Sequence, residues 1–405
     1  MSITFESFGL NKALLQALTN EGYTIPTPIQ AQAIPDVMLG KDLLGIAQTG
    51  TGKTAAFALP ILHRLAENRV APLPRTTRCL ILSPTRELAS QIAESFKTYG
   101  RHLGFKVAVV FGGVKYGPQE RAIQGGLDVL VATPGRLLDH MQQKTLDLSS
   151  TEIFVLDEAD QMLDLGFVKP IRQIVSRIPA KRQNLFFSAT MPPAIQTFAQ
   201  WCLTDPLSIE IARTSIPTSV THAFYPVAMD QRDELLLELL KQTEYHSVMI
   251  FTRTRKEADQ LTSLIKTTGQ PKVAAMHSDI NQVDRMKALA GFKAGEYEIL
   301  VATDVAARGI DISNVSHVIN YRVPENAEDY VHRIGRTGRA EAEGDAFTIL
   351  TADELDYAKS VEIFIDQPIP RRKLEDFDYI YTALLDDSPI KAVRRKKMGG
   401  GKKRR

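Results

Sequence analysis

Residues Ala47–Thr54 read AQTGTGKT, and few folds can present a loop of this composition. The segment fits the phosphate-binding pattern G/A-x-x-x-x-G-K-[ST], with Ala47 at the leading position where glycine is commoner. Gly50 and Gly52 allow backbone conformations that side chains forbid, so the N–H groups of the loop can converge on phosphates at the start of a helix. An ordinary glycine-rich turn would not explain the Lys-Thr pair or the helix-like AAFALPILHRLAE that follows it.

The side chains of this loop suggest two further roles. Lys53 is placed to reach the β- and γ-phosphates of a nucleotide, and Thr54 is placed to ligate Mg²⁺. The remaining loop positions are expected to surround the phosphates with backbone N–H groups: Gln48, Thr49, Gly50, Thr51 and Gly52.

An acidic cluster follows an apolar run about a hundred residues later. Ile153–Leu156 leads directly into Asp157, Glu158, Ala159 and Asp160. Asp157 can hold Mg²⁺ directly or through water, because this ion prefers hard oxygen ligands. Glu158 can orient or deprotonate an attacking water. A solvated acidic turn is the alternative, but it does not explain the preceding apolar residues or the phosphate loop. Together the two motifs predict a nucleoside-triphosphate motor.

The length and composition favour two domains. A chain of 405 residues exceeds the usual size of a single core, and 44% hydrophobic residues suffice for two. No apolar run approaches the roughly 20 residues of a membrane span, and the N-terminal residues lack the pattern of a signal peptide. Two distant cysteines, Cys79 and Cys202, predict neither a disulfide nor a metal site and suit a reducing, cytoplasmic location.

The charge is unevenly distributed. The net charge is +2, but residues 391–405 contain nine basic residues and no acid, which leaves residues 1–390 with a net charge of −7. The glycine triplet in KAVRRKKMGGGKKRR makes stable folding of this tail unfavourable. We expect the tail to bind nucleic-acid phosphates without sequence preference, the alternative being a solubilising extension.

Short apolar segments alternate with amphipathic ones, which predicts parallel sheets covered by helices. We expect one sheet domain at 1–205, a linker at 206–221, a second sheet domain at 222–375 and an extension with the basic tail at 376–405. The expected strands are Cys79–Leu82, Val107–Phe111, Val129–Ala132, Ile153–Leu156, Leu185–Phe187, Val248–Phe251, Val273–Met276, Ile299–Ala302, Val318–Tyr321 and Ala346–Leu350.

Polar clusters follow six of these strands. They begin at Ser83, Thr133, Asp157, Ser188, Thr252 and Thr303. Open α/β sheets bind ligands beyond the carboxyl ends of their strands, so the pattern predicts one binding edge on each domain.

With these motifs assembled, the chain resembles the DEAD-box family of ATP-dependent RNA helicases, which have two RecA-like domains in tandem. The resemblance extends from about Phe5 to Ala346, and within the family it is greatest for the bacterial RhlE-type branch. It implies that Gln30 reads the adenine edge, since an amide can both donate and accept, and that Tyr23 stacks on the ring. It also assigns nucleotide contacts to Phe5, Thr27, Gly309 and Asp311.

The resemblance implies an RNA-binding surface on both domains. Arginines and backbone amides there would contact phosphates and ribose hydroxyls, which gives a preference for RNA without sequence specificity. The residues are Pro84, Thr85, Arg86, Gly112, Gly113, Thr133, Pro134, Gly135 and Arg136 in the first half, and Thr252, Arg253, Gln282, Arg285, Thr303 and Asp304 in the second.

The segment His332–Arg339, HRIGRTGR, resembles the motif that supplies arginine fingers. Arg336 and Arg339 would reach the γ-phosphate from the second domain, although the basic segment alone could equally contact RNA. His332 would link to the acidic motif and to Ser188-Ala189-Thr190, whose Ser188 and Thr190 would couple ATP to strand separation.

A site divided between two domains implies that ATP and RNA promote each other's binding. The expected function is local unwinding of RNA duplexes or remodelling of RNA–protein complexes, with ATP and Mg²⁺. The expected partners are single- and double-stranded RNA and ribonucleoprotein or RNA-decay proteins, with no membrane and no disulfide-linked partner. Two alternatives stay open: an ATP-gated RNA clamp with little unwinding, and a DNA helicase or translocase of the same superfamily.

Overall fold

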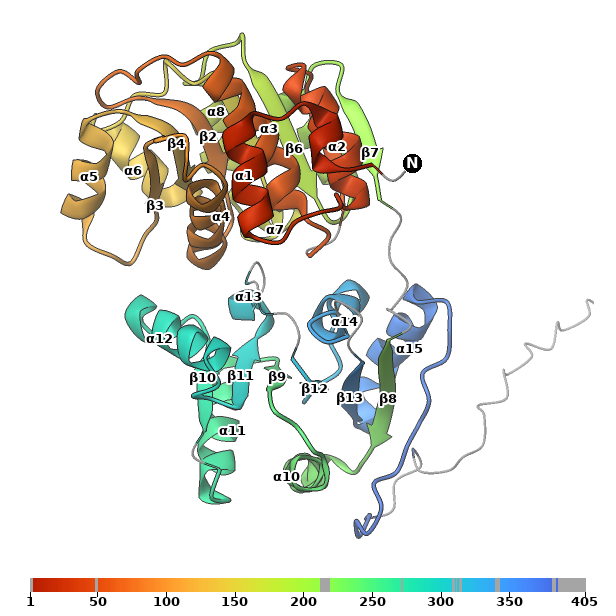
Figure 1. The fold of residues 1–405 in the computed structure, drawn as a ribbon. Coiled ribbons are helices and arrows are strands. Elements are labelled where there is room, and N and C mark those ends of the chain that lie inside the picture. Colours follow the sequence, from red (N-terminus) through yellow and green to blue (C-terminus); the bar gives the residue numbers. More distant parts are fainter. Residues whose placement is uncertain are drawn as a thin grey trace, which may run out of the picture.

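A computed structural model describes residues 3–47, 50–211, 219–270, 272–307, 310, 312, 315–338, 343–380 and 384. It contains two parallel β-sheets, each covered by helices, with the first domain above the second in Figure 1. The first sheet has the strand order β3-β4-β2-β5-β6-β1-β7, and the second has the order β10-β11-β9-β12-β13-β8. This is the α/β architecture that the alternating segments predict, in the arrangement of two tandem RecA-like domains that the resemblance implies.

The elements of the first domain alternate along the chain. Its strands are β1 Leu43–Ile46, β2 Thr77–Leu82, β3 Val107–Val110, β4 Leu127–Ala132, β5 Ile153–Leu156, β6 Gln183–Ser188 and β7 Leu207–Glu210. Its helices are η1 Phe5–Phe8, α1 Lys12–Asn20, α2 Pro28–Met38, α3 Lys53–Glu67, α4 Arg86–Tyr99, α5 Tyr116–Gln124, α6 Pro134–Gln142, α7 Ala159–Asp164, α8 Val168–Val175 and α9 Pro193–Cys202.

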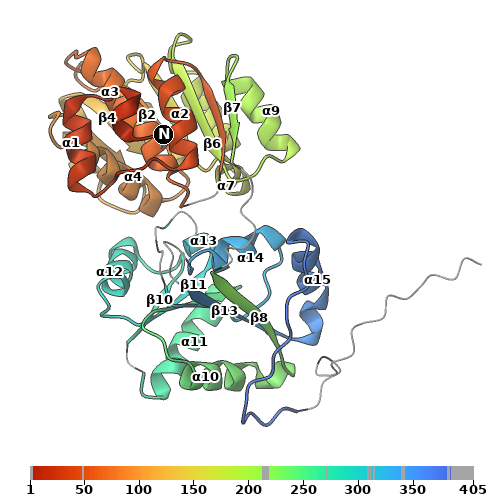
Figure 2. The same ribbon diagram turned by 45° about the vertical axis from the view of Figure 1, so that its right-hand side comes forward.

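The second domain repeats this alternation. Its strands are β8 Val220–Pro226, β9 Val248–Thr252, β10 Val273–Met276, β11 Ile299–Thr303, β12 His317–Asn320 and β13 Gly344–Leu350. Its helices are η2 Met229–Gln231, α10 Arg232–Gln242, α11 Arg255–Thr267, α12 Gln282–Lys293, α13 Asp304–Ala307, α14 Ala327–Ile334, η3 Ala352–Glu354 and α15 Leu355–Phe364. Figures 1 and 2 both show α13 and α14 on the side that faces the first domain.

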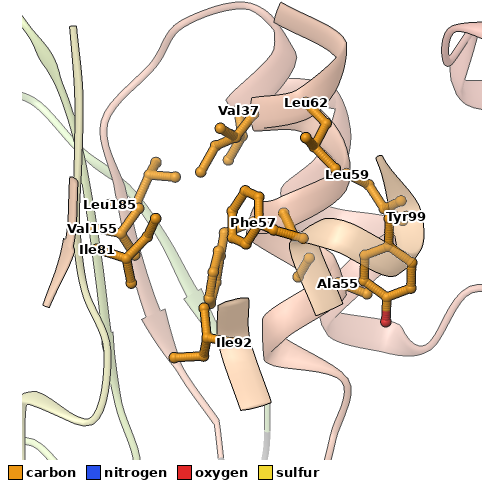
Figure 3. Close-up of a cluster of buried hydrophobic side chains, with 14 of the residues drawn as sticks. Val37, Ala55, Phe57, Leu59, Leu62, Ile81, Ile92, Tyr99, Val155 and Leu185 are labelled. Atoms are coloured by element: carbon orange, nitrogen blue, oxygen red, sulfur yellow. The ribbon is translucent and has the colours of Figure 1, made fainter. Parts of the chain in front are cut away.

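The central strands are apolar on both faces because helices cover both faces. Along β5, Ile153 and Val155 join one core cluster, and Phe154 and Leu156 join the cluster on the opposite face. Figure 3 shows Phe57 of α3 in the first cluster, close to strand side chains such as Val155. Phe57 is fully buried, with its ring centroid 5.3 Å from that of Phe187. Truncation of a buried aromatic side chain of this kind typically costs about 3–5 kcal/mol of stability.

The expected strands coincide with observed strands to within two residues at each end, but three strands were not predicted: β1, β7 and β8. The linker boundaries of 206–221 were therefore too wide. β7 pairs in parallel with β1, with Leu43 opposite Leu207, and β8 already begins at Val220. The connection between the sheets runs over 211–219, of which 212–218 lie outside the described residues.

The second domain also extends beyond the expected end at residue 375. The Gln231 side chain donates to the Asp378 carbonyl oxygen at 2.8 Å and accepts from the Ile380 N–H at 2.7 Å. Upstream, the Phe224 N–H donates to the Pro370 carbonyl oxygen at 2.8 Å, so the chain after α15 lies along β8. Residues 365–380 thus cover an edge of the second sheet, which is a common way to satisfy exposed strand groups. The basic tail lies outside the described residues.

Candidate active site and nucleic-acid groove

The phosphate loop connects β1 to α3, which begins at Lys53. Gly50 and Gly52 adopt φ angles of 86° and 93°, the left-handed region that favours glycine. The Lys53 side chain is only 5% exposed, and its Nζ has no hydrogen-bond partner among the described residues. A buried ammonium group without a hydrogen-bond partner is unfavourable, so the site suits a phosphate that would accept its hydrogen bonds. Gln48 and Thr49 lie outside the described residues.

Gln30 connects the start of α2 to this loop. Its Oε1 accepts from the Thr27 N–H at 2.9 Å, and its Nε2 donates to the Gly52 carbonyl oxygen at 3.2 Å. A Cβ atom on Gly52 would collide with Gln30 Nε2, so a side chain at this position would displace the Gln30 amide from these hydrogen bonds. Tyr23 is half exposed, and its ring centroid lies 6.2 Å from that of Tyr99.

Phe5 does not lie with these residues. It is 3% exposed and packs edge-to-face against Phe8 in the core of the first domain, with centroids 6.2 Å apart. Phe5 does not line the nucleotide pocket of this structure, so the nucleotide contact expected for it stays a prediction.

Asp157 and Glu158 follow β5 and are both buried. Burial raises the pKa values of both carboxyl groups, that of Glu158 to about 7, while the nearby Lys53 ammonium acts in the opposite direction. Glu158 has a φ of 52°, an unusual conformation for a residue with a side chain. Such strain is often found where a side chain must point into a site. Glu158 can therefore act as a proton acceptor near neutral pH.

Asp160 has a role that the sequence analysis did not assign. Its carboxylate accepts hydrogen bonds from the backbone N–H groups of Ala189 and Thr190 at 3.0 and 2.9 Å. The Ser188 hydroxyl in turn donates to the Thr190 carbonyl oxygen at 2.8 Å. The acidic motif after β5 is thus tied to the turn after the neighbouring strand β6. The pairing of β5 with β6 could not be read from the sequence, and it brings these residues together.

One pocket contains the phosphate loop, the acids and an arginine from the second domain. Arg336 is 5% exposed, and its guanidinium donates to the Ile310 carbonyl oxygen. The pocket is lined by Tyr23, Thr27, Gln30, Gly50, Gly52, Lys53, Thr54, Ala55, Leu88, Gln91, Ser95, Tyr99, Asp157, Glu158, Ile310 and Arg336. The fold therefore brings Arg336 to the same space as Lys53 and Glu158, although both lie far from it in the sequence.

A second cavity between the domains adjoins this pocket. It is lined from the first domain by residues that include Glu158, Asp160 and Thr190, and from the second domain by residues that include His332 and Arg336. His332 thus lines the same cavity as residues of the acidic and Ser-Ala-Thr motifs, and the link expected between them stays a prediction. Arg339, Gly309 and Asp311 lie outside the described residues. Thr51 lies on the loop itself, between Gly50 and Gly52.

Residues of both domains also line a groove at a different place. It is lined from the first domain by Pro84, Thr85, Arg86, Glu87, Gly112, Gly113, Thr133, Gly135, Arg136, Leu165 and Phe167, and from the second by Ser278, Asp279, Ile280, Asn281, Gln282, Arg285 and Val305. Arg86 lies against Gly113, where a Cβ atom would collide with the Arg86 guanidinium. The groove gathers most of the residues that were expected to contact RNA. Pro134 opens α6 beside it.

Hydrogen bonds join the domains within this groove. Glu87 accepts from Gln282 Nε2 at 2.9 Å and pairs with the Arg285 guanidinium at 3.0 Å. Arg86 Nη1 donates to Gln282 Oε1 at 3.2 Å. Glu87 was not singled out from the sequence, although it directly follows Arg86. A carboxylate that follows a single expected phosphate-binding residue gives no signal until the fold shows its partners.

Five residues expected to contact RNA are not among those that line the groove: Pro134 and four residues of the second domain. Thr252 and Thr303 are buried at the ends of β9 and β11. Asp304 forms a two-point ion pair with Arg333, with both N···O distances 2.6 Å. Arg253 donates to the Val323 carbonyl oxygen and pairs with Glu325 and Glu354, while its guanidinium lies over the Tyr357 ring. These side chains are engaged within the second domain.

Two family models match the chain. The model of the DEAD/DEAH box helicases matches residues 27–198, and that of the helicase conserved C-terminal domain matches residues 231–341. The DEAD-box ATP-dependent RNA helicase RhpA of Helicobacter pylori is 42% identical over 367 residues, which cover 90% of this chain and 73% of the relative. The DEAD-box ATP-dependent RNA helicase CshA of Bacillus licheniformis is 40% identical over 379 residues, covering 93% and 77% of the two chains.

Solved structures show the same fold. Dbp5 of S. cerevisiae bound to RNA and ADP BeF3 superposes with a TM-score of 0.82 at 29% identity, covering 92% of this chain and 96% of that chain. A DEAD box protein from the hyperthermophile Methanococcus jannaschii is 35% identical but has a TM-score of 0.52, covering 93% of this chain and 100% of that chain.

The fold and the site define a two-domain, nucleotide-dependent helicase. The chain belongs to the DEAD/DEAH box helicase family, and it is an ATP-hydrolysing enzyme. Its two bacterial relatives above are named RhpA and CshA, so the RhlE-type branch stays a prediction. Within the described part of the chain, none of the helices combines the length and the apolar character needed to cross a bilayer.

Proposed function

We propose that this helicase hydrolyses ATP when its two domains close on nucleotide and single-stranded RNA, and that closure separates short RNA duplexes locally or remodels RNA–protein complexes. The presence of Arg336 in the same pocket as Lys53, Asp157 and Glu158 is the observation that carries the proposal. Neither domain alone contains all of these groups.

The nucleotide roles follow from the pocket. Lys53 holds the β- and γ-phosphates with its otherwise unpartnered Nζ, assisted by the backbone of the loop that contains Thr51. Tyr23 stacks on the adenine ring. The Gln30 amide already forms hydrogen bonds with Thr27 and Gly52. Adenine would therefore either replace these bonds or form additional bonds with the same amide. Arg336 stabilises charge on the transferred phosphoryl group, a contribution of about 10³–10⁵ in rate for an arginine finger.

The donor set also suits Mg²⁺. Thr54 lines the pocket beside the buried Asp157 carboxylate, and a magnesium ion in such sites takes few protein ligands and completes its shell with phosphate oxygens and water. When bound, Mg²⁺ would neutralise charge on the phosphates. Glu158 would accept the proton of the attacking water as its O–P bond forms and the bond from the γ-phosphorus to the bridging oxygen breaks, leaving ADP and phosphate.

The groove supports binding of a nucleic-acid backbone. Arg86, Arg136 and Arg285 line it, together with Gly112 and Gly113, which have no side chains of their own. Contacts of this kind bind phosphates without reading bases. The whole-chain TM-score is higher with the RNA- and ADP BeF3-bound neighbour than with the M. jannaschii protein, although the latter is more similar in sequence. This difference supports a domain arrangement like that of the RNA- and nucleotide-bound neighbour.

The nucleotide pocket and the groove are each formed by residues of both domains, which supports coupling between the binding of ATP and of RNA. Closure completes the pocket through Arg336 and the groove through Gln282 and Arg285, so each ligand favours the arrangement that the other requires. Phosphate release would remove the γ-phosphate contacts and allow the domains to separate.

We also propose the cytoplasmic location that the cysteine content of the sequence predicts.

The test is ATP turnover without nucleic acid, with single-stranded RNA and with DNA of the same sequence. We expect strong stimulation by RNA alone. Equal stimulation by DNA would indicate a general nucleic-acid translocase, and high turnover without nucleic acid would show that the domains close unaided. Slow RNA release with a non-hydrolysed nucleotide, together with poor strand separation, would favour the clamp instead.

A further inference from the structure

Arg136 at the wall of the groove is held by contacts that the proposed RNA site does not explain. It lies in the first turn of α6, and its side chain is 12% exposed. Its Nη1 and Nη2 both donate to the Val114 carbonyl oxygen, at 3.3 and 3.2 Å. These bonds use part of the guanidinium and leave other N–H groups available to a ligand in the groove.

Tyr116, at the start of α5, is the aromatic partner of this arginine. The Arg136 guanidinium carbon lies over the Tyr116 ring, 5.7 Å from its centroid. The same ring stacks on His140, with centroids 4.2 Å apart and an angle of 21° between the planes. Arg136 and His140 are one helical turn apart on α6, so the Tyr116 ring can contact both side chains at once.

The Tyr116 ring is itself anchored. Its hydroxyl forms a hydrogen bond with Thr145 Oγ1 at 2.9 Å, and Thr145 Oγ1 also bonds to the His140 Nδ1 at 2.8 Å. His140 is fully buried, and burial together with the Arg136 charge lowers its pKa. A neutral His140 imidazole does not repel the Arg136 guanidinium, and the cluster contains no anion that would pair with the guanidinium in place of a phosphate.

Such support matters because an arginine side chain has many rotamers. Restricting these rotamers on binding costs conformational entropy. A side chain that is already ordered before binding avoids this cost and therefore binds more tightly. An aromatic face attracts the guanidinium yet leaves its edge N–H groups free to donate, unlike a carboxylate partner. The nearest carboxylate to Arg136, that of Asp139, is exposed and 3.8 Å away.

We propose that Tyr116 is a positioning residue that holds the Arg136 guanidinium against the groove wall, with its free N–H groups directed at an RNA phosphate. The inference rests on the proposed function, because it assumes that the groove binds RNA. Tyr116 itself touches neither nucleotide nor reacting atoms. Its contribution is confined to RNA affinity.

The test uses Tyr116→Leu, which removes the ring, and Tyr116→Phe, which keeps the ring and removes only the hydroxyl. In full-length enzyme we expect Tyr116→Leu to raise the RNA concentration for half-maximal ATPase stimulation about 3- to 30-fold. The turnover at saturating RNA and the KM for ATP should stay unchanged. Tyr116→Phe should stay within about threefold of the unsubstituted enzyme, and it keeps the proposal testable if Tyr116→Leu folds poorly.

A double-mutant cycle with Arg136→Gln separates positioning from general packing. Arg136→Gln should weaken RNA binding and reduce the salt slope by about 0.7, the value for one phosphate contact on a single strand. In that background Tyr116→Leu should have no further effect, and additive losses would overturn the positioning role. If Arg136→Gln alone changes neither RNA affinity nor the salt slope, the groove assignment fails instead.

The matched control is Tyr357→Leu. Tyr357 lies under the Arg253 guanidinium at 5.3 Å from its ring centroid, a similar arginine–tyrosine pair outside the groove lining. RNA affinity should be unchanged in this variant. An equal loss in Tyr357→Leu and Tyr116→Leu would show that the effect is not specific to the groove.

Discussion

The Asp160 carboxylate lies 2.9 Å from the backbone nitrogen of Thr190 and 3.2 Å from its hydroxyl oxygen, so one side chain holds two donors of a single residue. The same oxygen accepts from Ala189. Both Asp160 and Thr190 line the cavity that faces His332 and Arg336. A change at the acidic motif can therefore be transmitted to the turn after β6 and across the domain boundary.

We predict that Asp160→Asn uncouples ATP hydrolysis from strand separation. The neutral amide weakens the bonds to the turn, and hydrogen bonds to a charged group contribute about 1.5–3 kcal/mol. Unwinding of a short RNA duplex should fall about tenfold or more, with nucleotide affinity near that of the unsubstituted enzyme. Thr190→Val is the matched control, because it removes only the 3.2 Å hydroxyl bond and should have a smaller effect. Equal losses in both variants would contradict the proposed link.

Glu158→Gln is expected to retain ATP and RNA binding while turnover falls by about 10²-fold or more, since the amide cannot accept the proton of the attacking water. The side chain keeps its size, so the buried pocket should keep its shape. Nucleotide affinity is measured by titration, and turnover is measured by phosphate release at saturating RNA. Near-normal turnover would show that Glu158 is not the base.

The raised pKa of Glu158 predicts a pH dependence. Burial stabilises the protonated carboxyl, so the carboxylate that acts as base is lost as the pH falls through about 7. The kcat/KM for ATP, which reports on the free enzyme, should therefore fall about tenfold for each pH unit well below this value. RNA binding over the same pH range serves as the control and should change little. A flat kcat/KM profile from about pH 6 to about pH 8 would contradict the assignment.

The phosphate loop and the acidic motif could be predicted from the sequence because their chemistry depends on residues that are adjacent in the chain. β1 was missed because Leu43–Ile46 is only four residues long, although the phosphate loop that follows it is itself a signal for a preceding strand. β7 was missed because Leu207–Glu210 is stabilised by pairing with β1. The partners of Arg253 and Asp304 depend on which helices pack beside them. Glu87 gained significance only when the fold placed Arg285 beside it.

Removal of residues 391–405 should reduce the salt dependence of RNA binding and leave the RNA-saturated ATPase rate unchanged. The nine basic residues of this segment would each release counterions on contact with phosphates, whereas the catalytic pocket lies elsewhere in the chain. The measurement is RNA affinity at several salt concentrations. An unchanged slope would identify the tail as a solubilising extension.

Glu87 should control how strongly ATP and RNA promote each other's binding. Glu87 is 6% exposed, and its carboxylate bonds to Gln282 and Arg285 of the second domain. Glu87→Ala therefore leaves a buried guanidinium without its partner when the domains close. Loss of one member of a buried charge pair costs about 2–5 kcal/mol, and we expect the gain in RNA affinity on adding a non-hydrolysable ATP analogue to fall about thirtyfold or more. Linkage requires the same loss in the effect of RNA on analogue affinity. Glu94→Ala, an exposed change on the same helix where Glu94 pairs with Lys97, should alter this coupling less than about twofold. Equal coupling in both variants would show that the contact does not hold the domains together.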